Sequence, residues 1–426
     1  MTPSTSKTIL IISQVFVPDP ASVGQHIADV AYELAKRNHR VLVYTSRRGF
    51  ENPNAIYPAR ETINNVEIRR LPFASFGKKN LLLRILGTAT FMTQAFFRAL
   101  FTPRLAGIFF STSPPMIGLV CTIAAAIRRV PTVYWAMDLN PDQLLALGKI
   151  KPTSFSARLL EFVNKRILKH SNLIIALDRF MAKRLEDRRT IRHKLVTIPP
   201  WPHESFIEPV DPQTNPFRLK HNLQDKFVFM YSGNHSPSNP LKTLLDAAVR
   251  LKDHPDIRFL FVGGGTGKKE VEQYIKDHNL TNVISLPYQP LADLRFSLSS
   301  ADVHIVSLGS DMVGIIHPCK VYGAMAVARP ILFLGPKPSH ISDLLDRHSF
   351  GLHISHGDTD AAEKSIMTFF TTARATLQQM GQTAQHLLRS SLSQDQLCGQ
   401  FCDEVESAFA ITTTKPQSTA PALNLR

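Results

Sequence analysis

The stretch ILIISQVFVPDPASVGQHIADVAYELAKRNHRVLVYT, residues 9–45, contains the local pattern that decides the fold. A β-rich apolar run at 9–17 precedes a helical stretch near 24–38 and a second apolar run at 41–45. Strand, helix and strand in this order form a βαβ unit, whose strands are parallel in one sheet. No small-residue cleavage site follows the first run, so it is predicted as a strand rather than a signal peptide.

The same alternation continues along the first half of the chain. Helices are expected at 116–129 and 154–170, between apolar runs at 66–72, 107–113, 132–138, 172–178 and 194–200. It restarts after a polar, proline-containing segment, with apolar runs at 227–233, 258–265, 283–288, 302–308 and 330–336. The fold class is therefore α/β with two doubly wound, Rossmann-like sheets.

A chain of 426 residues exceeds what one core usually holds, so two domains are expected. The predicted parts are a first Rossmann-like domain at 1–201, a linker at 202–225, a second Rossmann-like domain at 226–385, a C-terminal helix at 386–410 and a disordered tail at 411–426.

The formal net charge of +15 predicts an anionic partner: nucleic acid, a phosphorylated substrate or an acidic membrane surface. No nucleic-acid-binding motif is present, so a nucleic-acid partner is not expected. The four cysteines show neither disulfide nor metal-ligand spacing, which favours the cytoplasm. No cofactor and no metal are predicted, because the sequence has no His/Cys cluster with metal-ligand spacing.

Small residues follow the strands of the second domain, where ligands of open α/β sheets bind. Ser232, Gly233 and Asn234 end the first strand, and Gly263 and Gly264 follow the next one. Such loops either let a diphosphate approach the backbone or simply make tight turns. Several of them at one sheet edge favour a ligand-binding site.

The segment HPCKVYGAMAVARP places His317 and Lys320 at the start of a helix. A lysine there opposes the helix dipole unless an anion is bound beside it. The alternative is a solvated lysine on an exposed turn.

Two positions of the first domain are candidates for the acceptor side. Gly24 lies in a loop that leads into a helix expected beside the cleft, and Asp138 ends an apolar strand. Asp138 is either a catalytic or acceptor-binding carboxylate or a helix cap.

The collinear segments that start at 18, 111, 138, 177, 231, 261, 285 and 318 resemble the family-four glycosyltransferases of the GT-B fold, especially the colanic-acid and O-antigen enzymes. They include PDPASVGQHIADVAYELAKRNHRVLVYTS, DLNPDQLLALG, YSGNHSPSNPLKTLLDAA, FVGGGTGKKEVE and PCKVYGAMAVARPILFLGP. The resemblance extends from about residue 8 to residue 390.

The resemblance implies two domains facing across a cleft and a metal-free, retaining sugar transfer. The nucleotide sugar, by default a UDP-sugar, would bind the second domain, and a lipid-linked or polysaccharide-precursor acceptor the first. Gly233 and Asn234 would then lie by the diphosphate and Lys320 by the phosphates or the sugar.

The resemblance also implies that Tyr288 and Gln289 lie by the nucleotide base and that Asp138 lies near the reacting carbon of the sugar. The chain departs from the family at Asn234, where an arginine is usual, and at Gly323, where a glutamate is usual. The missing glutamate leaves a non-catalytic nucleotide-sugar-binding relative as one alternative. A nucleotide-sugar 2-epimerase, which has the same two-domain architecture, is the other.

The segment KKNLLLRILGTATFMTQAFFRALFTPR, residues 78–104, is apolar with basic ends. Its 13 uncharged positions between Arg84 and Arg98 are too few to span a bilayer, which takes about 20 residues. It is either an interfacial helix on an anionic membrane surface or an ordinary buried helix. An interfacial helix would make this a peripheral protein on the inner face of the cell membrane.

Overall fold

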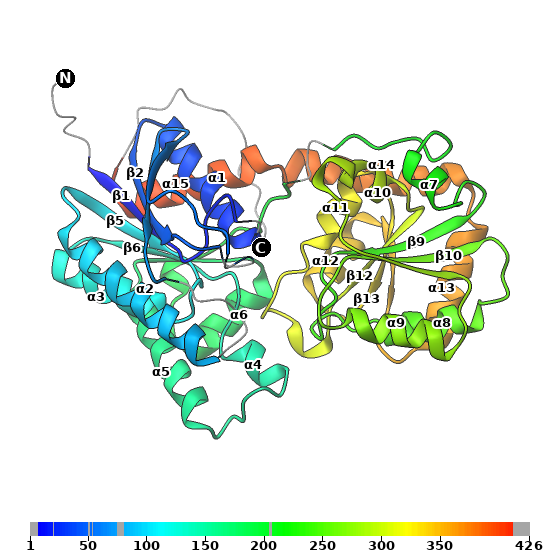
Figure 1. The fold of residues 1–426 in the computed structure, drawn as a ribbon, viewed down its shortest axis with the longest axis horizontal. Helices are drawn as coiled ribbons and strands as arrows, with labels where there is room; N and C mark the ends of the chain where they lie inside the picture. Colours follow the sequence, from blue (N-terminus) through cyan, green and yellow to red (C-terminus); the bar gives the residue numbers. More distant parts are fainter. Residues whose placement is uncertain are drawn as a thin grey trace.

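The computed structural model describes residues 7–19, 21–49, 52, 54–74, 81–203 and 207–411. It contains two sheets side by side, each flanked by helices (Figure 1). Part of the apolar segment at 78–104, namely residues 78–80, and the expected tail beyond residue 411 lie outside the described residues.

The first sheet has eight strands in the order β3-β4-β2-β1-β5-β6-β7-β8, parallel except for β3. Its strands are β1 (Thr8–Ile12), β2 (Arg40–Ser46), β3 (Arg60–Ile63), β4 (Val66–Leu71), β5 (Leu105–Phe110), β6 (Thr132–Trp135), β7 (Leu173–Ala176) and β8 (Leu195–Thr197). Its helices are α1 (Ser22–Lys36), α2 (Leu81–Phe101), α3 (Ile117–Arg128), α4 (Asp142–Ala146), α5 (Phe155–His170) and α6 (Arg179–Arg188).

The second sheet has six parallel strands in the order β11-β10-β9-β12-β13-β14. They are β9 (Phe227–Ser232), β10 (Ile257–Val262), β11 (Val283–Leu286), β12 (Val303–Ser307), β13 (Ile331–Leu334) and β14 (Gly351–Ile354). Its helices are α7 (Pro216–Lys220), α8 (Lys242–Arg250), α9 (Lys268–Asp277), α10 (Leu294–Ser299), α11 (Lys320–Ala326), α12 (His340–His348), α13 (Thr359–Thr371) and α14 (Arg374–Ser391).

Both sheets reverse their strand order once, between β1 and β5 in the first and between β9 and β12 in the second. The central strands are buried on both faces, as parallel sheets require, so they are continuous apolar runs such as TILII in β1. The predicted fold class is confirmed. Ligands of such sheets bind at the switch points, which directs attention to the ends of these four strands.

The C-terminal part differs from the single helix expected at 386–410. The chain forms α14 and then α15 (Gln394–Ala408), because the Ser393 hydroxyl caps a new helix by accepting a hydrogen bond from the Gln396 amide. Helix α15 returns to the first domain (Figure 1). There the ring centres of Phe401 and Trp135 are 4.4 Å apart. The expected linker also contains structure: Asn215 caps α7, whose Phe217 is buried.

Candidate active site

The loop after β9, at the switch point of the second sheet, lies directly against the loop after β10. The Gly233 amide donates to the Val262 carbonyl at 2.9 Å. Gly263 has a φ of +132°, and a Cβ atom there would overlap the carbonyl group of Gly233. Only glycine fits this position, so the Gly233 loop is held close to the sheet.

Lys320 lies over this loop at the start of α11. Its ammonium is 5.3 Å from the centre of the Tyr231 ring, and a Cβ at Gly233 would lie 2.7 Å from its Cε. Burial lowers the pKa of Lys320, although the neighbouring Cys319 acts in the opposite direction. Within the described residues it has no carboxylate partner, so its charge is available to an anionic ligand.

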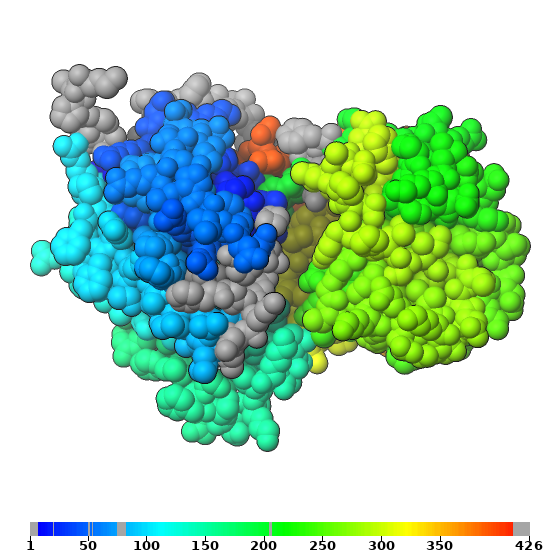
Figure 2. Space-filling view, in the orientation of Figure 1, coloured from blue at the N-terminus to red at the C-terminus, as the bar shows by residue number. Residues whose placement is uncertain are grey.

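A cavity of about 320 Å³ opens beside Lys320 between the two domains. Figure 2 shows the furrow that separates the domains on one face of the molecule. The lining includes five of the predicted donor residues: Ser232, Gly233, Tyr288, Gln289 and Lys320. The predicted residues Asn234, Gly263, Gly264 and His317 are not part of the described lining.

Asn234 and Gly264 lie next to residues that line the cavity. The Asn234 carbonyl accepts a hydrogen bond from the Tyr231 hydroxyl at 2.8 Å. Gly264 supports the ring of Tyr288, because a Cβ there would lie 2.9 Å from it. His235, which follows Asn234, contacts the Gly233 carbonyl through Nδ1 at 3.1 Å, and burial lowers its pKa to about 4.

His317 belongs to a contact between the domains. Its Nδ1 is 3.2 Å from a carboxylate oxygen of Asp178, which follows β7, and its Nε2 is 2.8 Å from the Tyr322 hydroxyl. Burial raises the pKa of Asp178, but the hydrogen bond and charge of His317 outweigh it and lower the pKa to about 2.

His340 completes this group, and the ligating atoms of Asp178, His317 and His340 lie within 4.8 Å of one another. The second Asp178 oxygen caps α6 by accepting from the Phe180 and Met181 amides. Asp178 contacts the His317 ring, whose centre is 4.3 Å from that of His340, so the three residues form an interdomain network.

Further bonds join the domains near this network. The Arg179 guanidinium binds both oxygens of Asp343, at 2.6 and 2.9 Å, and Arg184 donates to the Val313 carbonyl at 2.6 Å. The Leu139 amide donates to the Ile315 carbonyl at 3.2 Å. Asp138 therefore lies directly beside a point at which the two domains touch.

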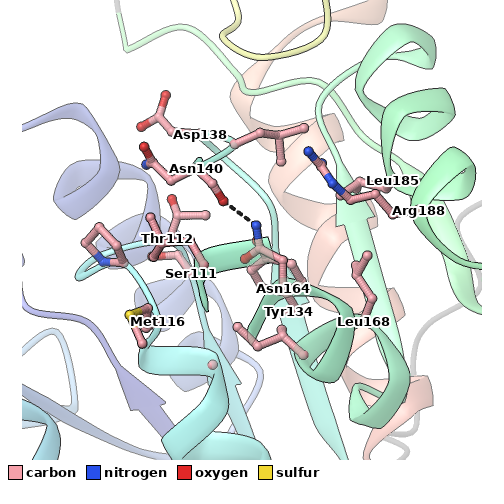
Figure 3. A pocket seen from close by; sticks show the side chains of 15 residues that line it. Ser111, Thr112, Met116, Tyr134, Asp138, Asn140, Asn164, Leu168, Leu185 and Arg188 are labelled. Carbon is pink, nitrogen blue, oxygen red and sulfur yellow. Dashed lines mark hydrogen bonds between the residues drawn. The ribbon is translucent and has the colours of Figure 1, made fainter. Parts of the chain in front are cut away.

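Burial raises the pKa of Asp138 to about 6. Figure 3 shows Asp138 and Asn140 at the edge of a small cavity of about 30 Å³, with Asn164 donating to the Asn140 carbonyl below them. No hydrogen bond or ion pair joins the Asp138 carboxylate to the described part of the protein. Unlike a capping aspartate, it is free to act on a ligand.

Gly24 lies in the first turn of α1 rather than in the loop expected before the helix. It lets this turn approach the loop after β1, since a Cβ there would lie 3.1 Å from the Phe16 backbone. Its neighbours Ser22, Gln25 and His26 line the interdomain cavity, and the sequence did not single them out. His26 contacts the carbonyls of Ser22 and Trp201, each at 2.8 Å, and burial lowers its pKa to about 4. Because Trp201 is 175 residues away from His26 in the chain, no local sequence pattern predicts this contact.

Two doubly wound domains that face each other across a cavity define the GT-B fold class. The structure resembles that of Anabaena HepE in complex with UDP and glucose, with a TM-score of 0.70 and 15% identity. The likeness covers 94% of this chain and 100% of that one, and it shows the fold.

Family models identify both halves of the chain. The model "Glycosyl transferase 4-like domain" matches residues 22–201, and "Glycosyl transferases group 1" matches residues 213–387. The chain belongs to the group 1 glycosyltransferases, as the sequence resemblance predicted.

Two curated proteins are similar to most of the chain. The probable glycosyltransferase WbjE of Pseudomonas aeruginosa is 23% identical over 361 residues, which are 84% of this chain and 88% of WbjE. The putative colanic acid biosynthesis glycosyl transferase WcaI of Escherichia coli K12 is 24% identical over 337 residues, 75% of this chain and 81% of WcaI.

Proposed function

We propose that this glycosyltransferase moves a sugar from a UDP-sugar to a lipid-linked or polysaccharide-precursor acceptor, with retention of configuration. The second domain binds the donor and the first binds the acceptor. The observation that carries the proposal is the Lys320 cation, which lies in the interdomain cavity without a carboxylate partner in the described protein. A diphosphate is the partner that such a cation favours.

The rest of the donor site is assigned around that contact. Ser232 and Gly233 lie by the diphosphate, where the glycine permits close approach of phosphate oxygens to the backbone. The Tyr288 ring is 60% exposed and lines the same cavity with Gln289, so this pair is assigned to the base. The UDP complex of HepE supports a uridine nucleotide, and the name of WcaI supports a polysaccharide precursor.

The proposed reaction is a displacement on one face of the sugar. The acceptor hydroxyl oxygen bonds to the anomeric carbon while the bond to the UDP oxygen breaks. UDP leaves with that electron pair, and its phosphate takes the hydroxyl proton. Lys320 stabilises the charge that develops on the departing phosphate, and Asp138 positions the acceptor hydroxyl.

The test incubates the protein with a panel of UDP-sugars and a lipid-linked saccharide, with and without EDTA. Free UDP and a product whose NMR spectrum shows the donor's anomeric configuration are expected, with EDTA having no effect. An inverted linkage or loss of activity in EDTA contradicts the mechanism. An epimerised UDP-sugar, or binding without any turnover, would replace transfer by one of the two alternative functions.

We also propose that the first domain binds the inner face of the cell membrane peripherally. In the described residues no helix is long and apolar enough to cross a bilayer. Helix α2 buries Gly87, Phe91, Ala95 and Ala99 on one side, but its first turns are exposed. This arrangement fits neither a fully buried helix nor a spanning one.

The proposed membrane-binding surface, called the α2–α3–α5 surface, combines exposed apolar and basic side chains. Its apolar members are Leu82, Leu83, Ile85, Leu86, Phe97, Phe101, Ile123, Ile127, Phe155, Leu159 and Phe162. Its exposed basic members are Arg84, Arg98, Arg129, Arg158, Lys165, Arg166 and Lys169. Helices α2 and α3 contain no acidic residue, which suits an anionic lipid surface.

Flotation with liposomes containing phosphatidylglycerol tests this surface. The wild type is expected in the floating fraction at low salt, and the variant Leu83→Glu/Leu86→Glu at the bottom. Leu219→Glu/Leu291→Glu is the matched control, because both leucines are exposed on the second domain. Equal flotation of the wild type and the α2 variant would refute the assignment.

A further inference from the structure

A second cavity, of about 430 Å³, lies at the switch point of the first sheet. Gln14 and Val15 follow β1 on one side of it, and Thr112 and Ser113 follow β5 on the other. We call it the β1–β5 cavity. It shares no described lining residue with the interdomain cavity, but both reach the first turn of α1.

The charged groups of the β1–β5 cavity are two cations and one carboxylate. Arg84 enters from α2, Lys149 from the segment after α4, and Asp138 from the end of β6. Neither cation forms an ion pair with any residue that the structure describes. A guanidinium and an ammonium that share a cavity are suited to a phosphate or a diphosphate.

The wall between Asp138 and the cations is polar. It is formed by the side chains of Thr112, Ser113, Asn140 and Gln143. In the described part of the chain these hydroxyl and amide groups have no side-chain hydrogen bond to protein. They offer both donors and acceptors, which is what the hydroxyls of a sugar require.

The rim of the cavity on α2 is apolar. Leu82, Leu83, Ile85 and Leu86 flank Arg84 in the same turns, and their exposed fractions are 75%, 42%, 57% and 52%. These side chains begin the α2–α3–α5 surface. A ligand whose charged group contacts Arg84 therefore has a polar cavity on one side and an apolar helix on the other.

We propose that the β1–β5 cavity is the acceptor site, and that Arg84 and Lys149 bind the phosphate or diphosphate that joins the acceptor sugar to a lipid chain. The sugar lies against the polar wall beside Asp138, and the chain lies over the first turns of α2. The proposal rests on the proposed function and specifies the chemical class of its acceptor.

Equilibrium binding of geranyl diphosphate tests the site without any turnover. Calorimetry compares the wild type, Arg84→Gln/Lys149→Gln, and the control Lys36→Gln/Arg60→Gln, which removes two exposed positive charges elsewhere on the first domain. The site variant is expected to bind geranyl diphosphate at least tenfold more weakly and UDP as the wild type does. The control is expected to bind both as the wild type does.

Two further probes separate the parts of the ligand. Inorganic pyrophosphate and geraniol are each expected to bind at least tenfold more weakly than geranyl diphosphate. Equal binding of geranyl diphosphate by the wild type and the site variant overturns the proposal, and so does pyrophosphate binding as tight as that of geranyl diphosphate. Failure of UDP to bind the wild type would count against the proposed function instead, because geranyl diphosphate binding is measured independently.

Discussion

Replacing Lys320 tests the donor site most directly. The informative variant is Lys320→Met, because methionine keeps an apolar chain of similar length against Tyr231 and Gly233, which the native side chain contacts. The variant removes the charge and leaves most of the packing. Lys320→Ala removes both, so the difference between the two variants measures the contribution of the stem.

The expected magnitude follows from the surroundings of the ammonium. A partly desolvated, charge-assisted hydrogen bond contributes about 1.5–3 kcal/mol, since the competing water is largely excluded. Loss of that bond corresponds to a weakening of UDP binding by roughly ten- to a hundredfold. Burial lowers the pKa of Lys320, so the ligand-free protein gains nothing from its charge. Lys320→Met should therefore unfold at the same or a higher denaturant concentration without UDP.

The assay is calorimetric titration of UDP together with urea unfolding of the ligand-free protein. Lys242→Met is the control: Lys242 is an exposed lysine of the same domain that is paired with Asp246. It should bind UDP as the wild type does. Unchanged UDP affinity in Lys320→Met would remove Lys320 from the donor site, and weaker binding combined with lower stability would assign it a structural role.

Three more outcomes are expected. Asp138→Asn should lower kcat by about 10² without changing UDP affinity, because the acceptor hydroxyl loses the carboxylate that positions it. The wild-type rate should rise with pH through about 6, where Asp138 ionises, and a flat profile from pH 5 to 8 would exclude the carboxylate. Gly263→Ala should destabilise the protein more than Gly357→Ala. At Gly357, with a φ of +86° and open space around it, alanine adds only backbone strain of about 1–3 kcal/mol, whereas at Gly263 it also overlaps Gly233. Equal urea midpoints of the two variants would contradict the close contact with Gly233. Burial lowers the pKa values of His26, His235 and His304 to about 4, whereas these imidazoles take up protons near pH 6.5 in the unfolded chain. Acidification from pH 7 to 5 should therefore lower the free energy of unfolding by up to about 2 kcal/mol for each histidine. Identical urea curves at the two pH values would refute the burial of the neutral imidazoles.

The central strands of both sheets could be predicted because each is an uninterrupted apolar run buried on both faces, as in the FVFMYS of β9. Strand β3 could not be predicted, for the opposite reason. Its residues, RETI, alternate between exposed and half-buried, and only pairing with β4 makes them a strand. Short edge strands are specified by a neighbour rather than by their own composition.

The same distinction separates the site residues. Gly233 and Lys320 could be placed in the cavity because backbone position alone brings strand ends and helix starts to one edge of the sheet. The direction of a side chain depends on its partners, as His317 illustrates: its ring contacts Asp178, which is 139 positions away in the chain and belongs to the other domain. No local pattern contains that information.

Helix α15 shows how such a long-range contact affects function. The sequence predicted a terminal helix, but its position on the first domain depends on Arg37, which bonds Asp403 at 2.6 Å and Glu406 at 3.0 Å, and on Phe401 packing against Trp135. Because α14 stays with the second domain, the chain crosses between the domains twice, once between Trp201 and Asn215 and once at Leu392 and Ser393. Separating the two domains would cost the contacts of Arg179 with Asp343 and of His317 with Asp178. The two crossings and the interdomain contacts of Arg179 and His317 hold the walls of the interdomain cavity next to each other.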